Sequence, residues 1–202
     1  MSLITSATLS WFDDGCCDVK YLDKWQDAPL SFAPGQVTNS NWYSDSYEKV
    51  IMPQANGRSF SKAADLLLRY QFYPDHILSF TSDFKREGRR LHQGDRIVQR
   101  FHLLRLLGRP ILDVLSMTEV SEVIDGPDRI GFSYVTVAPH VAQGKWQVAM
   151  RWQESGALLL TINSVLRPNP EEPAGNHSLI RYYQRQAHHH GLRHFTRLVQ
   201  TA

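Results

Sequence analysis

The feature that most constrains the fold of this chain is a pair of neighbouring runs with a sequence period of two. Residues 145–153 alternate apolar with mostly polar side chains, and residues 157–167 place leucines and an isoleucine on one face, with Ser164 as its only polar member. A period of two is the pattern of a strand with one buried face. The short segment 154–156 between the runs suits a hairpin turn. The two runs therefore predict antiparallel strands of one sheet.

Other strand-like runs precede this pair, so we expect the sheet to be a meander. They lie at residues 47–52, at 82–86 (a weak run), and at 96–104, 115–124 and 130–138. Apolar residues at helical spacing after Ser59, interpreted as an N-cap, predict a helix that Pro74 limits, and a second short helix is expected at 75–80. A long helix with one apolar stripe is predicted at 178–200, with Ser178 as its N-cap.

This order of elements predicts an α+β protein with the helix-grip architecture. We expect a curved antiparallel sheet of about seven strands wrapped on a long C-terminal helix, with two short helices after the first strand. A sheet that curls round a helix leaves a hollow between them, and that hollow is commonly a cavity for a hydrophobic ligand. Residues 1–45 are rich in Ser, Asp, Asn and Pro with scattered aromatics. They are interpreted as an irregular lead-in packed on a single domain, residues 46–202.

Composition excludes several classes of protein. The chain has 202 residues, 42% of them hydrophobic, and a net charge of +2, which does not suit a disordered chain. Cys16 and Cys17 are adjacent and cannot form a disulfide scaffold. Neither a run of about 18 apolar residues nor a signal peptide is apparent. We therefore expect a soluble, cytoplasmic protein.

Positive charge is concentrated in two places. Residues 85–109 hold eight basic and two acidic residues, and no acidic residue follows Glu172. One interpretation is a basic interaction module for an acidic partner, and the other is an ordinary solvated surface. Nucleic acid is not an expected partner, because aromatic residues are not interleaved with the basic ones as a base-stacking surface requires.

The segment 129–146 reads Arg-Ile-Gly-Phe-Ser-Tyr-Val-Thr-Val-Ala-Pro-His-Val-Ala-Gln-Gly-Lys-Trp. It resembles the core Gly-Phe-x-Tyr-Gly-Thr-Leu-Pro-x-His-x-x-x-Gly-Glu-Glu of uncharacterised protein family 0548 of bacteria and plants. Arg167-Pro168 and Gln184-Arg185 resemble later features of that family, whereas Lys145-Trp146 replaces its paired glutamates. The matching positions within the core are Gly131, Phe132, Tyr134, Thr136, His140 and Gly144.

The resemblance covers about residues 40–200 and implies a fold rather than a reaction, because the family has no established activity. Such proteins are similar to the superfamily of START domains and the birch pollen allergen, which also have the helix-grip fold. The resemblance therefore agrees with the order of elements derived from the sequence pattern.

The leading functional hypothesis is a non-catalytic protein that binds an apolar small molecule or lipid between the sheet and the last helix. Tyr134 and Thr136 face either the hollow or solvent, His140 is either a polar anchor at the cavity mouth or a loop residue, and His194 either lines the cavity or belongs to the core. The candidate ligand-binding residues are Phe132, Tyr134, Thr136, His140, Trp146, Met150, Ile162, Arg167 and His194.

Catalysis, metal and cofactor binding have little support in the sequence. His190 and His194 have a spacing that suits two metal ligands on a helix, but no third ligand is indicated. No motif for a catalytic nucleophile or for a cofactor is present. The alternative function is an acid–base enzyme, cyclase-like or hydrolase-like, on the same fold, which would need His140 to converge with Tyr134 or His194. The sequence does not indicate an oligomeric state.

Overall fold

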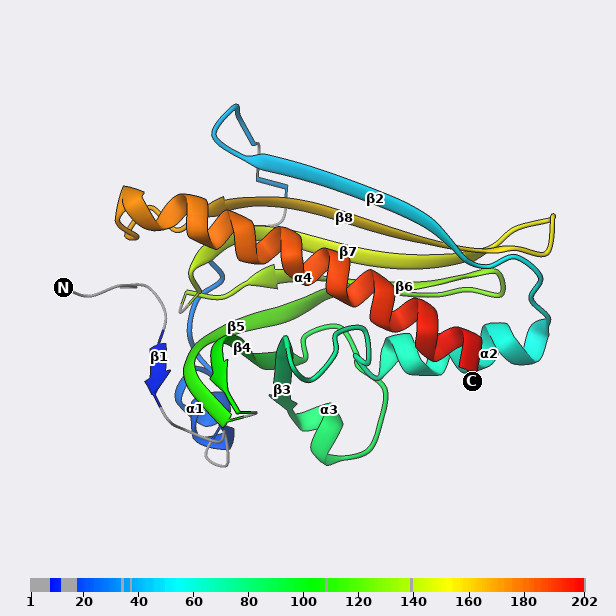
Figure 1. Ribbon diagram of the computed structural model, residues 1–202, viewed down its shortest axis with the longest axis horizontal. Coiled ribbons are helices and arrows are strands. Elements are labelled where there is room, and N and C mark those ends of the chain that lie inside the picture. Colours follow the sequence, from blue (N-terminus) through cyan, green and yellow to red (C-terminus); the bar gives the residue numbers. More distant parts are fainter. Residues whose placement is uncertain are drawn as a thin grey trace.

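The computed structural model describes residues 8–11, 18–33, 35–36, 38–107, 109–138 and 140–201, and it shows an α+β helix-grip fold (Figure 1). Cys16 and Cys17 lie outside the described residues. The helices are α1 (Val19–Lys24), α2 (Gly57–Leu68), α3 (Asp83–Arg86) and α4 (Ala174–Thr201). The strands are β1 (Thr8–Trp11), β2 (Tyr43–Met52), β3 (Leu78–Ser82), β4 (Arg96–Leu106), β5 (Arg109–Asp125), β6 (Arg129–Thr136), β7 (Ala142–Trp152) and β8 (Leu158–Pro168).

The strands form one antiparallel sheet that curves around α4 without closing, as Figure 1 shows. Its order is β2-β8-β7-β6-β5-β4-β3, and β1 pairs with β5 outside this path. The two runs with a period of two are the hairpin β7–β8, in which Trp152 pairs with Leu158 and Trp146 with Ser164. The meander and the helix-grip architecture expected from the sequence are confirmed.

Three local expectations are wrong. The N-cap of α2 is Asn56, whose side chain accepts a hydrogen bond from the backbone of Ser59, while the Ser59 side chain accepts one from the backbone of Asn56 in a capping box. Helix α4 already begins at Ala174, so Ser178 lies inside it.

The third wrong expectation concerns residues 75–86, where helix and strand are exchanged. The expected helix at 75–80 overlaps strand β3, and the expected weak strand at 82–86 is mostly α3. Segments this short carry too few apolar residues to separate the two periods. Pairing of β3 with β4 and the cap that Ser82 provides to the Lys85 amide decide the outcome.

The lead-in contains two short elements that the sequence pattern did not indicate, β1 and α1. Leu22 and Trp25 pack on the convex face of the sheet, the face opposite α4, against Val98 and Met117. Beside them Asp18 pairs with the fully buried Arg100. The division into residues 1–45 and 46–202 stays a prediction.

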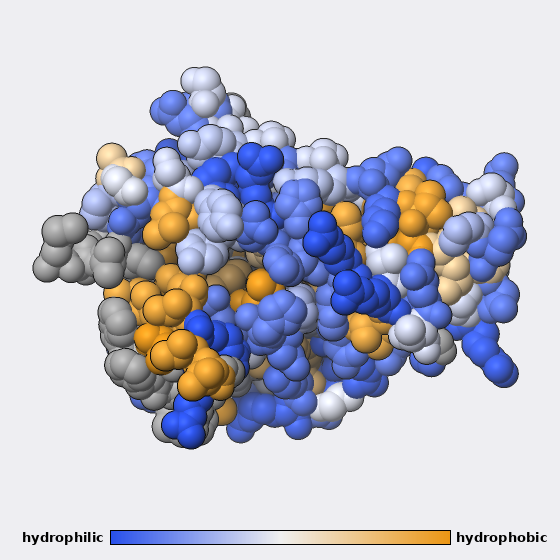
Figure 2. Space-filling view, viewed as in Figure 1, coloured by the Kyte–Doolittle hydropathy of each residue, from blue (hydrophilic) through white to orange (hydrophobic). Residues whose placement is uncertain are grey.

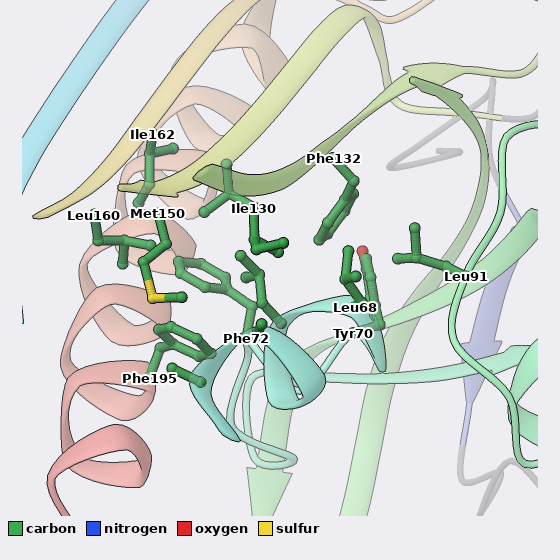
Figure 3. Close-up of a cluster of buried hydrophobic side chains, with 14 of the residues drawn as sticks. Leu68, Tyr70, Phe72, Leu91, Ile130, Phe132, Met150, Leu160, Ile162 and Phe195 are labelled. Atoms are coloured by element: carbon green, nitrogen blue, oxygen red, sulfur yellow. The ribbon is translucent and has the colours of Figure 1, made fainter. Parts of the chain in front are cut away.

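The main core lies on the concave face of the sheet. Side chains of β6, β7 and β8 converge there on α2, on the segment after α2 and on α4 (Figure 3). Phe72 is at the centre of this core, with ring centroids 5.5 Å from Trp146 and 5.9 Å from Phe195. Gly191 allows α4 to approach, because a Cβ atom there would lie 2.2 Å from Phe72 Cε1. Aromatic side chains therefore fill this part of the expected hollow.

Candidate functional site

The space between α4 and the sheet is divided into a filled part and an open part. Under the second half of α4 it is filled by Phe72 and its neighbours. Beside the first half lies a groove of about 260 Å³ against β4 and β5. The groove is bounded mainly by apolar side chains of α4, β4, β5 and the segment before β3. Prominent among them are Ile77, Phe101, Leu103, Val114, Ile180 and Ala187.

His140 also lines the groove, from the loop between β6 and β7. Its Nδ1 accepts a hydrogen bond from the Ala142 amide at 3.0 Å, and its carbonyl accepts one from Asn169 Nδ2 at 3.1 Å. Because Nδ1 is an acceptor, the ring hydrogen is on Nε2. Burial lowers the pKa of His140 to about 4. At neutral pH His140 is therefore an uncharged hydrogen-bond donor.

Helix α4 contributes further polar atoms to the groove. Tyr183 Oη donates a hydrogen bond to the Leu103 carbonyl at 3.3 Å, which joins α4 to β4 across the groove. Gln184 lines the groove, and its buried Oε1 has no hydrogen-bond partner among the described residues. A buried acceptor without a partner costs free energy, so it is a candidate contact for a ligand donor. The sequence analysis did not single out Gln184, because one glutamine on an amphipathic helix carries no distinctive signal.

The apolar candidates from the sequence belong to the filled part. Phe132, Trp146, Met150 and Ile162 are fully buried in the core around Phe72 and do not line the groove. Figure 3 shows three of them, Phe132, Met150 and Ile162, pointing into this core. They share the concave face, as the period of two predicts, but the segment after α2 occupies the space in front of them.

Tyr134 also lies in the filled part, where three phenols meet Gln99. Gln99 Nε2 donates to Tyr70 Oη at 2.5 Å, and Tyr134 hydrogen-bonds with Gln99, Tyr73 and Tyr70. Burial raises the pKa of Tyr134 above its usual value, so its phenol stays protonated at neutral pH.

The remaining polar candidates are separated from one another. Thr136 Oγ1 accepts hydrogen bonds from the Gly144 amide at 2.9 Å and from Ser31 Oγ at 2.7 Å, which is a structural role at the end of β6. Arg167 lies over the Trp42 ring, with its guanidinium carbon 4.6 Å from the ring centroid. His194 lies near Asp75, in a different pocket that Tyr70 and Tyr73 also line.

Therefore His140 shares a pocket neither with Tyr134 nor with His194, the two residues with which an acid–base enzyme would need it to converge. His140 lines the groove, Tyr134 is in the core and His194 lies at the other end of α4. Among the described residues, no group of three or more His, Cys, Asp or Glu side chains is placed to bind a metal ion.

The basic stretch 85–109 is largely paired within the molecule. Arg89 bonds to both carboxylate oxygens of Asp95, at 2.7 and 2.8 Å, and Arg96 pairs with Glu119 at 3.0 Å. The other pairs are Arg86–Asp83, Arg90–Asp65 and Arg100 with Asp18 and Asp113. These pairs neutralise much of the charge that suggested an interaction module.

The structure is similar to several solved structures at low sequence identity. Ara h 8.0201 has 9% identity and a TM-score of 0.50, and the match covers 80% of this chain and 99% of that one. A putative uncharacterized protein from Rhizobium leguminosarum has 13% identity and a TM-score of 0.49, covering 83% and 100% of the two chains. A hypothetical protein from Helicobacter pylori has 11% identity and a TM-score of 0.49, covering 82% and 90%. The match to Ara h 8.0201 supports the helix-grip fold.

No curated protein matches the sequence significantly. No helix in the described part of the chain is both long and apolar enough to cross a membrane. The model of one protein family, described as a domain of unknown function, matches residues 31–194. The chain therefore belongs to the family DUF1990.

Proposed function

We propose that this protein binds a hydrophobic small molecule or lipid, without catalysis, in the groove between α4 and strands β4 and β5. The observation that carries the proposal is the groove itself, with its largely apolar lining and a volume of about 260 Å³. An apolar cavity of about 150 Å³ binds benzene, and typical ligand pockets have volumes of about 300–1,000 Å³. The groove therefore suits a small apolar ligand or one end of a longer one. A cytoplasmic location is part of the proposal.

The two polar groups at the groove refine the expected ligand. The His140 Nε2–H is a neutral donor, and Gln184 Oε1 is an acceptor without a partner among the described residues. Because neither carries a charge at neutral pH, we expect an uncharged ligand with a hydroxyl or carbonyl group in preference to an ionised one.

We also propose that the chain is related to uncharacterised protein family 0548, which segment 129–146 resembles. Two of the glycines that carry it have a physical reason in the sheet. A Cβ atom at Gly131 would lie 2.5 Å from the Val148 carbonyl oxygen, and one at Gly144, where φ is +149°, would lie 2.0 Å from that of Val165. The motif glycines therefore allow close approach of β6, β7 and β8, which supports the assignment of the segment to a sheet of this kind.

Two measurements test ligand binding. A native mass spectrum of freshly purified protein reports a co-purified ligand and the number of subunits. N-phenyl-1-naphthylamine, a neutral dye whose fluorescence rises in apolar surroundings, then serves as a probe of the groove. We expect the dye to bind the wild-type protein and to compete with any co-purified ligand.

A matched pair of variants locates the bound dye. Ala187 is buried and lines the groove, so Ala187→Leu fills part of it and is expected to weaken dye binding at least about tenfold, or about 1.4 kcal/mol. Ala157→Leu adds the same volume at a buried position beside the β7–β8 turn and is expected to leave dye binding unchanged. Equal binding by both variants would place the dye outside the groove. Absence of both dye binding and a co-purified ligand would contradict the proposed function.

A further inference from the structure

The hairpin between β4 and β5 exposes a cluster of large apolar side chains. Leu104, Leu106 and Leu107 are 52%, 63% and 95% exposed, and on α4 nearby Leu179 and Tyr182 are 47% and 56% exposed. These are the five most exposed large apolar side chains among the described residues. Single exposed leucines are ordinary, whereas a cluster of them marks an interaction surface.

The exposed leucines adjoin the mouth of the groove. Leu179 and Tyr182 line the groove together with Leu103, the residue that precedes Leu104. Figure 2 shows hydrophobic residues gathered over the β4–β5 hairpin and the adjacent first half of α4, on a molecule whose visible surface is otherwise mostly hydrophilic. The apolar surface therefore continues from the hairpin tip, defined here as residues 104–107 with Arg109, to the groove.

Leu107 has a backbone conformation that ordinarily favours other residues. Its φ is +49°, in the left-handed region, where a bulky side chain is strained. Turns of this kind between two strands favour Asn, Asp or Gly. A nearly fully exposed leucine at this position therefore carries a conformational cost without a packing gain inside the molecule. Such an outlier is best explained by a contact outside it.

Positive charge accompanies the leucines. Arg105 and Arg109 flank Leu106 and Leu107 in the sequence. Attachment to a membrane surface generally needs two contributions, and apolar insertion combined with basic residues is one effective pair. Arginine guanidinium groups suit lipid phosphates.

We propose that the hairpin tip docks on a lipid bilayer that contains anionic lipid, with its leucines at the boundary between headgroups and acyl chains and its arginines at the phosphates. Docking in this orientation brings the mouth of the groove to the bilayer surface. An apolar ligand then moves between bilayer and groove without crossing water. The docking goes beyond ligand binding and does not depend on it, because the tip is exposed whether or not the groove is filled.

Sedimentation with vesicles tests the apolar contribution. Wild-type protein is expected to partition onto vesicles of phosphatidylcholine with phosphatidylglycerol, and more weakly onto phosphatidylcholine alone. Leu107→Asn places a residue suited to the left-handed conformation at the turn, so the variant keeps its fold. Combined with Leu106→Thr, it is expected to lower the partition coefficient at least about tenfold.

The control for this change is Val50→Thr on the edge strand β2. Val50 is 45% exposed and lies at the opposite edge of the sheet from β3. We expect Val50→Thr to partition like the wild type. Equal partitioning by the tip variant and the wild type would overturn the proposal, as would wild-type protein that binds neither kind of vesicle.

A second pair of variants tests the electrostatic contribution. Arg105→Gln with Arg109→Gln is expected to lose about fivefold per arginine on anionic vesicles and little on phosphatidylcholine. Arg58→Gln with Arg151→Gln removes the same charge at exposed positions elsewhere and is expected to have a much smaller effect. Equal losses in the two pairs would overturn the role of the tip arginines.

Sedimentation velocity without lipid tests whether the hairpin tip binds a second copy of the chain instead of a bilayer. A dimer of the wild-type protein that disappears in the tip variant would show that the tip joins two copies of the chain, and would overturn docking on lipid. Dye binding in lipid-free solution separately reports ligand binding, so failure of one proposal is distinguishable from failure of the other.

Discussion

The two halves of α4 contact the same sheet in different ways. The second half presses Gly191 and Phe195 onto Phe72, so that no side chain separates the Gly191 backbone from the Phe72 ring. The first half borders the groove instead, with Ile180 and Tyr183 opposite β4. One helix therefore both closes the core and borders a candidate binding site. The two halves differ in the side chains beneath them, because the Phe72 ring fills the space under the second half, whereas Ile77 of the same segment only borders the groove beside the first half.

The largest expected effect on stability comes from truncating the Phe72 side chain, which fills the space under the second half of α4. Phe72 is fully buried, and Phe72→Ala is expected to lower the free energy of unfolding by about 4 kcal/mol, through lost burial and a residual cavity. Phe101→Ala, in the half-buried wall of the groove, is expected to cost about 1–2 kcal/mol, because the groove already leaves part of that ring without neighbours. Urea denaturation measures both values. Equal costs would show that the two halves are packed alike.

Acid is expected to lower the free energy of unfolding through two buried histidines. His140 lines the groove, and His188 packs against β2. Burial lowers the pKa of His140 and of His188 to about 4, from an ordinary value near 6.5. The unfolded chain therefore binds protons below about pH 6.5, whereas the folded protein binds them only near pH 4. The stability from each neutral histidine is complete above pH 6.5 and falls by about 1.4 kcal/mol per pH unit toward pH 4.

Urea denaturation at pH 7.0, 5.5 and 4.5 checks this dependence. His140→Gln and His188→Gln should each remove one histidine's share of the slope, which is about 3 kcal/mol over the whole range. A wild-type slope that survives both buried substitutions would assign the acid sensitivity to other groups.

The smallest expected effects on stability come from two Gly→Ala changes in α4, and they have opposite signs in its two halves. Gly191→Ala must displace the Phe72 ring, and its overpacking cost of about 1–3 kcal/mol exceeds the gain in helix propensity. Gly175→Ala lies in the first turn of the same helix, where a Cβ atom meets nothing within 4 Å. It is expected to stabilise the protein by up to about 1 kcal/mol. Thermal unfolding of the two variants compares the signs, and stabilisation by Gly191→Ala would contradict the close packing.

Sequence patterns predicted the fold well where a period was long and regular. The alternation in β7 and β8 and the apolar stripe of α4 are long and regular, and all three elements form, with α4 beginning four residues earlier than the pattern predicted. Between residues 75 and 86 the elements are only four or five residues long, so pairing with β4 and a side-chain cap decided the structure.

The site was harder to predict, because its shape depends on a segment without a period. Tyr70 adopts a φ of +62° directly after α2, and the chain then turns Phe72 and Tyr73 into the hollow. No pattern of residues 69–77 indicated this turn, so Phe132 and Trp146 were expected to line a cavity that Phe72 occupies. His140 was expected near a cavity mouth, and it lines the groove. The motif that indicated His140 is local, whereas the filling of the hollow is a long-range property.

The buried ion pairs on the convex face have a consequence for the order in which the chain becomes fixed. Asp18 bonds to Arg100 at 2.8 Å, and Arg100 also bonds to Asp113 at 2.9 Å. The site that receives Asp18 exists only after β4 and β5 have paired, some 80 residues later in the chain. Since synthesis runs from the N-terminus, residues 18–25 leave the ribosome before the strands β4 and β5 that they contact. The contact of Asp18 with this site therefore depends on the pairing of β4 with β5, and it reports that these two strands have come together.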